Sequence, residues 1–474
     1  MPVVFSSVTF LFVFLPVTFL GLAALRGRGW QNSWLLAMSV VFYVWGGGAA
    51  AGVIAYVTLV SYLGGRLPWP RWRSRIHLRR GALATLVALL LLPLLFYKYL
   101  PPVSLSVGLA IPWDLALPLG ISFFTFHGIS YVVDIARGDA GERNLRDYAL
   151  YLFVFPHQIA GPIVRYSEIR GEIKLGRTAP LDETVLGLAR FSWGLAKKVV
   201  VADPIGRLAD QLFGVSAAGG QLSAADAWLA AVLFAIQIYF DFSGYSDMAV
   251  GLALMMRFHF PENFRQPYRS VSVTDFWRRW HMTLSRWFRD YVYIPLGGSR
   301  HGPVRSMVAL LTVFFLTALW HGATLNFLIW GGLHSAMLLI ERWTGLRNVS
   351  RFATIRRLGM LLFIVVSWVP FRAPTMLALD NHWGAMFTGP WTGLSPTALT
   401  GMTPFVWLAL LIALISVIGP RDTTGFATVF GGRAVAELPG ISMRRLVIGT
   451  VLVLGVALWT VMWSDFSPFL YFQF

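Results

Sequence analysis

Apolar runs of about twenty residues recur along this chain and alternate with connections rich in arginine. The clearest runs are 8–25, 81–100, 224–256 and 446–463. About twenty residues of α-helix are enough to cross the hydrocarbon core of a bilayer. Because backbone amides in lipid must find their partners within the protein, runs of this length cross a membrane as helices. The pattern therefore predicts an all-α polytopic integral membrane protein.

The composition supports a membrane class and sets its size. The chain has 474 residues, of which 56% are hydrophobic and only 13% charged, whereas soluble domains carry about 25% charged residues. Its 20 Trp and 36 Phe are typical of the aromatic belts at bilayer interfaces. We expect a single membrane-embedded domain over residues 1–474, with roughly ten or more transmembrane helices.

The net charge of +17 follows from loops that carry Arg and Lys. Such residues gather in cytoplasmic loops and contact anionic lipid headgroups, so we expect membrane lipids and no nucleic acid as partners. The connections 66–80, 257–305 and 342–357 are predicted to be cytoplasmic, and 101–114, which has no Lys or Arg, is predicted to lie outside. The first run is read as a retained span with its N-terminus outside. With no cysteine in the chain, disulfides, thiolate metal sites and a cysteine nucleophile are excluded.

Three segments depart from a simple span. Residues 148–164 are apolar but contain two prolines and a glycine, and both flanks are basic, which favours a re-entrant segment over a kinked span. Residues 184–201 mix apolar and basic residues, which favours an interfacial helix. Residues 306–341 lie between two basic flanks, which predicts a hairpin that turns near 321–324.

Acidic residues inside the run 224–256 must be explained. Asp241 and Asp247 lie there beside Ser243 and Tyr245. A charged side chain at membrane depth costs several kcal/mol unless it is paired or hydrated. We therefore expect these side chains to face a polar interior. The arginines of the segment 257–305 are their expected partners, Arg278, Arg279 and Arg286 among them.

Histidines supply the candidate for catalysis. His321 lies within an apolar run, and a neutral imidazole can accept a proton from a hydroxyl group near neutral pH. Gly322 is expected to let a substrate approach the backbone. His281 is expected to orient His321 or to bind substrate. Structural roles, such as a hydrogen bond to a helix carbonyl, remain open for both histidines. No histidine spacing resembles a metal site, so no metal is expected.

Nine arginines in 257–305 could hold the phosphates of a nucleotide-like donor, because guanidinium groups match phosphate geometry. Cytoplasmic topology explains most of them without a ligand. The aromatic residues of the same segment are expected to anchor it at the membrane interface.

Several motifs together resemble the membrane-bound O-acyltransferase family, and most closely its alginate-acetylating bacterial branch. The resemblance covers nearly the whole chain. The motifs are Phe155-Pro156-His157-x-Ile159-Ala160-Gly161-Pro162, Tyr239-Phe240-Asp241-Phe242-Ser243-Gly244-Tyr245-Ser246-Asp247-Met248-Ala249, Glu262-Asn263-Phe264-x-Gln266-Pro267-Tyr268, Phe276-Trp277-Arg278-Arg279-Trp280-His281 and Leu319-Trp320-His321-Gly322.

The resemblance implies tilted helices around a central funnel that joins a cytoplasmic donor side to an outer acceptor side. It implies that His321 and His281 are catalytic, and that acetyl-CoA, or another acyl-CoA, is a donor substrate rather than a bound cofactor. The residues expected to bind substrate or line the tunnel are Trp320, Gly322, His157, Gln158, Asp241, Ser243, Tyr245, Asp247, Arg278, Arg279 and Trp280.

The C-terminal aromatic tail, 467–474, is similar to a motif found in relatives that work with an extracytoplasmic partner. The similarity implies that Tyr471 accepts the acyl group as an ester and passes it on, which is reasonable because a phenolate ester is a good acyl donor. An aromatic anchor at the interface is the alternative.

The expected function is thus O-acylation, with acetyl as the group that the family favours. The acceptor is an extracellular or cell-wall polysaccharide such as alginate, and the partner is an SGNH-type or alginate-modifying acyltransferase. The expected location is the bacterial cytoplasmic (inner) membrane. A transporter that uses Asp241 and Asp247 as a substrate or proton path is the alternative, although transporters often contain internal repeats and this sequence shows none.

Overall fold

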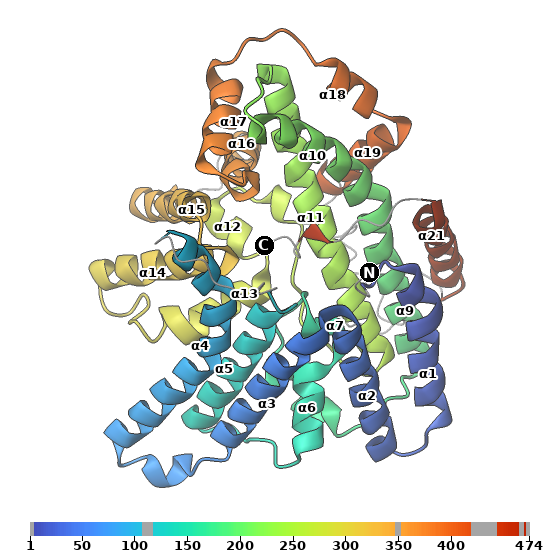
Figure 1. Ribbon diagram of the computed structural model, residues 1–474, viewed down its shortest axis with the longest axis vertical. Helices are drawn as coiled ribbons and strands as arrows, with labels where there is room; N and C mark the ends of the chain where they lie inside the picture. Colours follow the sequence, from blue (N-terminus) through green and yellow to red (C-terminus); the bar gives the residue numbers. More distant parts are fainter. Residues whose placement is uncertain (1–3, 107–116, 347–351, 419–442, 464–468, 471–474) are drawn as a thin grey trace. The chain divides into compact units, whose positions relative to one another are not determined.

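The computed structural model describes residues 4–106, 117–346, 352–418, 443–463 and 469–470, and in this part of the chain all regular structure is helical (Figure 1). Five helical segments among the described residues are long and apolar enough to cross a membrane: Ile76–Ser104, Ala224–Met255, Pro303–His321, Ala353–Arg372 and Met443–Trp463. Three shorter apolar helices are Phe10–Ala24, Ala51–Gly65 and Pro404–Ser416. The prediction of an all-helical polytopic membrane protein is confirmed.

The chain separates into two compact units. Unit 1 consists of Met1–Ser192, Ser246–Pro261 and Gly432–Val451, and unit 2 of Trp193–Tyr245, Glu262–Gly431 and Leu452–Phe474. Helices α9 (Leu181–Ala196), α11 (Ala224–Met255) and α21 (Met443–Trp463) contribute residues to both units. That residues 1–474 act as a single domain stays a prediction.

Unit 1 is built around α5, which packs against α3 and α4, while α2 packs against α6 (Figure 1). Gly128 on α5 allows this close packing, because a Cβ there would lie 3.1 Å from Val57 Cγ1 on α3. The elements of unit 1 are η1 (Phe10–Phe14), α1 (Leu15–Ala24), α2 (Arg28–Gly47), η2 (Gly48–Ala50), α3 (Ala51–Gly65), η3 (Trp69–Trp72), α4 (Ile76–Ser106), α5 (Ile121–Arg137), α6 (Leu145–Phe153), α7 (Phe155–Gln158) and α8 (Tyr166–Ile173).

Helix α4 is longer than the sequence suggested. It continues through Pro101 and Pro102 to Ser106, where a connection was expected. The prolines do not end it at once, although each removes one backbone donor and strains the preceding turn.

The segment 148–164 is broken, as predicted. Helix α6 ends at Phe153, α7 is one turn, and the backbone then runs without helix to Val164. Pro156 stands in the first turn of α7, where a proline is tolerated. The carbonyl of Val164 accepts from Tyr151 Oη at 3.0 Å, and its N–H donates to His127 Nε2 at 3.2 Å. The irregular backbone is therefore paired inside protein, as it must be at membrane depth.

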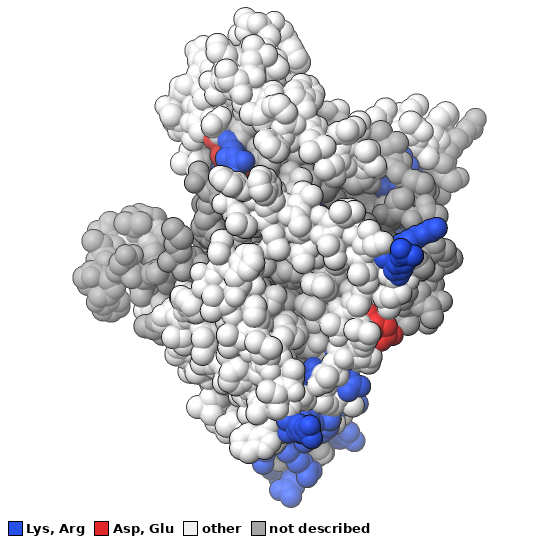
Figure 2. Space-filling model, turned by 90° about the vertical axis from the view of Figure 1, so that its right-hand side faces the viewer, with Lys and Arg blue, Asp and Glu red and all other residues white. Residues whose placement is uncertain are grey.

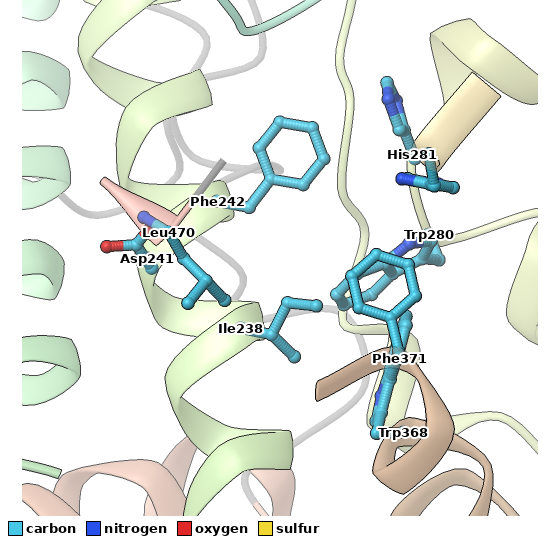
Figure 3. Close-up of a pocket in the computed structure, with 9 residues that line it drawn as sticks. Ile238, Asp241, Phe242, Trp280, His281, Trp368, Phe371 and Leu470 are labelled. Atoms are coloured by element: carbon cyan, nitrogen blue, oxygen red, sulfur yellow. The ribbon is translucent and has the colours of Figure 1, made fainter. Parts of the chain in front are cut away.

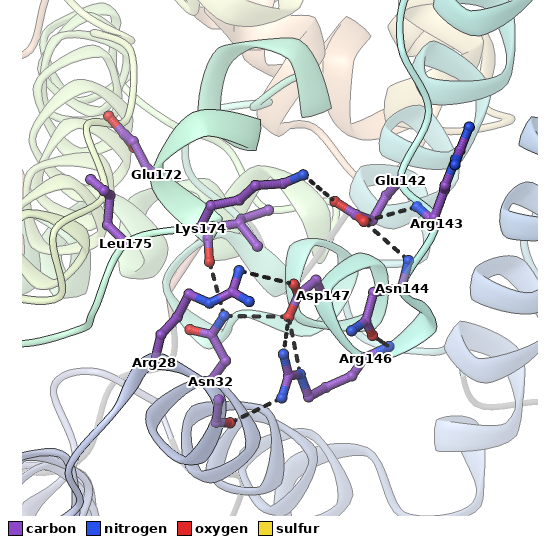
Figure 4. A network of polar contacts seen from close by, with 12 residues as sticks. Arg28, Asn32, Glu142, Arg143, Asn144, Arg146, Asp147, Glu172, Lys174 and Leu175 are labelled. Carbon is purple, nitrogen blue, oxygen red and sulfur yellow. Dashed lines mark hydrogen bonds and ion pairs between the residues drawn. The ribbon is translucent and has the colours of Figure 1, made fainter.

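A polar network ties α2, α6 and α8 of unit 1 together (Figure 4). Asp147 binds Arg146 at 2.9 Å and Arg28 at 3.6 Å. Glu142 accepts from the N–H groups of Arg143 and Asn144 at 2.8 and 3.0 Å. Burial raises the pKa of Glu142, but hydrogen bonds from Tyr166 and these N–H groups outweigh it, so the net shift is downward. Glu142 therefore stays charged near neutral pH.

Unit 2 holds the predicted hairpin. Helix α14 ends at His321, α15 begins at Leu325, and the two pack along their length with α16 on the other side of α15. The remaining elements are η4 (Lys197–Ala202), α10 (Asp203–Ala217), η5 (Pro267–Arg269), α12 (Val273–Trp277), α13 (Met282–Phe288), η6 (Arg289–Tyr293), α14 (Pro303–His321), α15 (Leu325–Thr344), α16 (Ala353–Arg372), α17 (Met376–Thr388), α18 (Pro396–Gly401) and α19 (Pro404–Ile418).

The interfacial reading of 184–201 is wrong. Arg190 and Lys198 are buried and paired with carboxylates, Arg190 with Asp247 at 2.9 Å and Lys198 with Asp241 at 2.6 Å. These pairs also correct the partners expected for the two acids. Arg279, one of the expected partners, pairs with Asp275 at 2.8 Å. Arg190 and Lys198 lie 57 and 43 residues before the acids that they bind, and they were overlooked because they were taken for interface residues.

The aromatic residues of 257–305 largely pack inside unit 2. Phe276, Trp280, Trp287 and Phe288 are buried among protein side chains, so the expectation that they anchor the segment at the interface is wrong for these four. Figure 2 shows a face on which charged side chains are few and most of the surface is uncharged, as expected for a surface that contacts lipid.

Candidate functional site

A small cavity in unit 2 brings together four of the predicted site residues: Asp241, Trp280, His281 and His321 (Figure 3). Its volume is about 30 Å³, roughly the space that one water molecule occupies in the liquid. Residues from α11, α14, α16, the loop before α13 and the C-terminal tail form its wall. They are Ile238, Asp241, Phe242, Trp280, His281, His321, Trp368, Phe371 and Leu470.

His321 is the last residue of α14 and is partly exposed. Its ring lies among aromatic rings, 4.8 Å from Phe371 and 5.2 Å from Trp330 between centroids, in edge-to-face arrangements. Such packing fixes the plane of the imidazole ring. A helix end combined with an aromatic enclosure therefore presents His321 to the cavity.

His281 is held by its backbone as well as by packing. Its φ of 41° and ψ of 54° are left-handed, a conformation that costs a non-glycine residue about 1–2 kcal/mol. The neighbouring Met282 N–H donates to the carbonyl of Asn263 at 2.9 Å, which helps to fix this turn. Strained residues of this kind persist where the surrounding structure imposes them, often at functional sites.

Asn263 determines which nitrogen of His281 carries the proton. Asn263 Oδ1 lies 3.0 Å from His281 Nδ1 and accepts from the N–H and Oγ1 of Thr283 at 3.3 and 2.8 Å. A backbone N–H only donates, so the atom that it reaches is the amide oxygen, which only accepts. His281 Nδ1 must therefore donate, and Nε2 carries the lone pair.

His281 Nε2 is buried and has no hydrogen-bond partner among the described residues. Burial lowers the pKa of His281 to about 3, because the charged imidazolium is penalised away from water. The ring is thus neutral at physiological pH, and the residue lines the cavity. The lone pair on Nε2 can accept a hydrogen bond.

The aromatic wall connects the two histidines. The Trp320 ring lies 4.6 Å from that of His321 and 6.0 Å from that of His281. The Phe242 ring meets His281 edge to face at 4.8 Å. Rings on several sides keep the site apolar, which strengthens any electrostatic interaction inside it.

Several predicted residues lie outside the lining of this cavity. Arg278 is exposed, and Arg279 pairs with Asp275. Ser243 and Tyr245 are buried on α11, and Asp247 binds Arg190 in unit 1. His157 and Gln158 belong to α7 of unit 1. Tyr471 lies outside the described residues.

Gly322 has a packing role that the sequence did not suggest. Its φ of 179° is ordinary extended backbone, and a Cβ would lie 2.4 Å from Phe327 Cε2. The glycine therefore makes room for the Phe327 ring, and its expected role in substrate approach stays a prediction.

The sequence interpretation missed Asn263 and Lys198. Asn263 belongs to the motif that begins at Glu262. No role was predicted for it because its partner, His281, is eighteen positions away. Lys198 was taken for an interface residue. A lysine pair in an apolar stretch, in a chain whose apolar run 224–256 contains acids, is the signal that could have identified it.

Metal binding gains no support from the described residues, where no three His, Cys, Asp or Glu side chains are grouped as metal ligands.

Comparison with known proteins adds the family. Residues 120–378 match the model of the membrane-bound O-acyltransferase family. A probable alginate O-acetylase from Pseudomonas putida is 40% identical over 99% of this chain and 100% of its own. A peptidoglycan O-acetyltransferase from Helicobacter pylori is 35% identical over 78% and 77% of the two chains. A teichoic acid D-alanyltransferase from Bacillus subtilis is 28% identical over 53% and 67%.

Proposed function

Because the chain belongs to the membrane-bound O-acyltransferase family, and is an O-acyltransferase, we propose that His321 and His281 carry the reaction in the cavity that they share. The observation that carries this proposal is that one cavity is lined by both histidines, and that His281 Nε2 has no hydrogen-bond partner in the described part of the chain. The acyl group is acetyl, and acetyl-CoA is its donor.

In the proposed reaction, His321 takes the proton of the acceptor hydroxyl as that oxygen attacks the thioester carbonyl. A tetrahedral intermediate forms and collapses, the carbon–sulfur bond breaks, and the imidazolium returns its proton to the leaving thiolate of CoA. General-base help of this kind contributes about 10²- to 10⁴-fold. His281 Nε2 accepts a hydrogen bond from the entering hydroxyl and orients it.

The donor is proposed to enter from the cytoplasmic side near the segment 257–305. A second, mostly apolar cavity of about 210 Å³ lies in unit 2 beside this segment, with Arg289 and Ser285 on its wall. An apolar cavity with a guanidinium at its edge suits the pantetheine arm and phosphates of CoA. This cavity supports the entry route but is compatible with other apolar ligands that carry an anionic group.

The acceptor is proposed to be an extracellular or cell-wall polysaccharide, reached through an extracytoplasmic SGNH-type or alginate-modifying partner at the bacterial inner membrane. The names of the relatives, which concern alginate, peptidoglycan and teichoic acid, support an acceptor of this class. Tyr471 is proposed to carry the acyl group between the cavity and that partner. Its neighbour Leu470 lines the cavity, which is consistent with such a relay.

The transporter alternative loses its main argument. Asp241 and Asp247 suggested an ion path, but each is matched by a buried cation, Lys198 and Arg190 respectively. Ion pairs account for acids at membrane depth without transport, and the relatives that match are acyltransferases.

The test uses the purified protein in proteoliposomes with acetyl-CoA. The chain has no cysteine, so a thiol reagent detects released CoA without a background from the protein. We expect H321A and H281A each to abolish most of the release and of the acetyl label on the acceptor. His382 is a matched control, since it is also buried in unit 2 but bonds Ser216 and the Ala227 carbonyl. Full activity of a well-folded H321A protein would refute the proposal.

A further inference from the structure

The C-terminal tail is bound to unit 2 through its backbone. Phe469 and Leu470, the two residues of the tail that the structure describes, are only 1% and 5% exposed. The N–H of Leu470 donates to Asp241 Oδ2 at 2.9 Å. This bond does not depend on the side chain of residue 470, so Asp241 recognises the course of the peptide rather than a particular residue.

Asp241 belongs to a buried charge cluster. Its other oxygen, Oδ1, lies 2.6 Å from Lys198 Nζ, which also binds Asp203 Oδ1 at 2.8 Å. Lys198 thus joins two buried carboxylates. A buried negative charge is stabilised by a further donor, and the Leu470 N–H supplies one.

The local fold explains why this cluster forms. Lys198 lies in η4, a π-helical turn between α9 and α10, and such turns occur often at functional sites. A Cβ at Gly244 of α11 would lie 2.8 Å from the Gly194 carbonyl. The two backbones therefore approach closely just where Lys198 reaches Asp241.

Phe469 adds contacts of a second kind. Lys198 Nζ lies 4.7 Å from the centroid of its ring, within the range of a cation–π interaction. The ring of Tyr245 meets it edge to face at 4.9 Å and 88°. Two consecutive tail residues are thus held by one set of side chains, a backbone N–H by Asp241 and an aromatic ring by Lys198 and Tyr245.

We propose that Lys198, Asp203, Asp241 and Tyr245 form an intramolecular docking site for the tail, and that the docked tail closes one wall of the histidine cavity. We call these four residues the tail dock. Leu470 lies on that wall together with His281 and His321, and the cavity that remains is only about 30 Å³. A thioester needs far more room, so displacement of Leu470 from this wall is the step that opens the site.

Asp241 and Lys198 are then positioning residues that act through the tail. Asp241 was predicted to bind substrate or line the tunnel. Its hydrogen bond to the Leu470 N–H of the same chain offers another reason for an acid at this position of α11. The proposal concerns where the tail is held, and it does not require that Tyr471 carries an acyl group.

The absence of cysteine allows a direct test with one introduced thiol. The full-length L470C protein is treated with N-ethylmaleimide in detergent, and labelling is followed by mass. L470C keeps the backbone N–H that Asp241 binds. We expect slow labelling in the L470C protein and labelling about tenfold faster or more when D241N is added, because a hydrogen bond to a charged group is replaced by a weaker one.

Asp226 provides the matched control. It is a buried carboxylate of unit 2 that also accepts from a backbone N–H, that of Ser395 at 3.1 Å. D226N should leave the labelling of L470C unchanged. Equal labelling rates for L470C with and without D241N, or fast labelling in both, would overturn the docking site.

General loosening by D241N is detected with a second thiol. A231C, at a position 1% exposed on α11, should stay protected in the D241N background. If A231C is labelled as well, F469A decides, since it removes the ring from Lys198 and leaves all charges in place. Faster labelling of L470C in F469A supports the dock, and no change refutes it. These rates are independent of acyl transfer, so this proposal and the proposed function can fail separately.

Discussion

Two histidine pairs, His127 with His157 in unit 1 and His281 with His321 in unit 2, differ in their surroundings. In unit 1 the rings of His127 and His157 lie 4.5 Å apart. His127 Nε2 accepts from the Val164 N–H, and His157 Nε2 donates to the Tyr151 carbonyl at 2.8 Å. Both rings therefore pair with the irregular backbone around α7.

In unit 2 the partners are different. His281 is bound by a side chain, Asn263, and its Nε2 has no hydrogen-bond partner among the described residues. His321 stands at a helix end among aromatic rings, and both histidines line one cavity. Each buried ring of the unit 1 pair also has one nitrogen without a partner among these residues, so an unpaired nitrogen alone does not mark a histidine proposed to react. The separating features are the kind of group that holds each ring, backbone in unit 1 and a side chain for His281, and whether a cavity reaches the residue.

Replacement of His321 should have the largest effect. We expect H321A to lower the rate of CoA release by about 10²- to 10⁴-fold, because the general base is lost. H321Q keeps much of the size but not the basicity and should be as inactive. Thermal unfolding in detergent is the control for folding. If H321Q retained more than a tenth of the activity, His321 would not be the general base, and the difference between the two histidine pairs would not indicate which pair reacts.

Particular residues show how far the sequence could lead. The helices, the hairpin at 321–324 and the break at 153–159 follow from apolar runs, basic flanks and prolines, which are local signals. His281 and His321 were identified through residue chemistry and family resemblance. The partners of the buried acids were not identified. Lys198 contacts Asp241 across 43 residues of sequence, and no local pattern in the sequence predicts such a contact. The role of Gly322 was missed for the same reason, since Phe327 decides it.

Removal of Asn263 should have the next effect. N263A leaves His281 free to move its proton to Nε2, so we expect a loss of about ten- to a hundredfold in kcat, the range seen when a group that orients a histidine is removed. N263D keeps an acceptor for the Nδ1 proton and should recover most of the rate. It should also shift the acid limb of the pH–rate profile upward, since a carboxylate raises the pKa of a neighbouring imidazole.

The matched control for this change is N381A. Asn381 also lies in unit 2 and donates to the Ser216 carbonyl at 3.2 Å, far from any histidine of the cavity. Its rate should be unchanged. Equal rates for N263A and N381A would mean that the rate does not depend on which nitrogen of His281 carries the proton.

The unit 1 pair should affect stability more than rate. H157Q keeps a donor toward the Tyr151 carbonyl but loses the ring that stacks on Phe260 at 5.1 Å. We expect a lower unfolding temperature, from a loss of about 1 kcal/mol, and a rate per folded molecule within about threefold of the unchanged protein. A loss as large as that of H321A would place unit 1 in the reaction and restore the substrate role predicted for His157.

The smallest effect concerns pH and a histidine outside both pairs. His259 Nδ1 lies 2.8 Å from Glu172, and this hydrogen bond raises the pKa of His259, against a smaller opposing effect of burial. A raised pKa means that the folded protein binds the proton more tightly than the unfolded chain. The stabilisation is therefore complete below about pH 6.5 and is lost as the pH rises through the folded pKa. Because His259 is nearly half exposed, the effect should stay below about 1 kcal/mol.

The unfolding temperature in detergent should fall slightly above neutral pH, and H259N should remove that slope. A slope that persists in H259N would assign the pH response to another group and leave His259 without a role in stability.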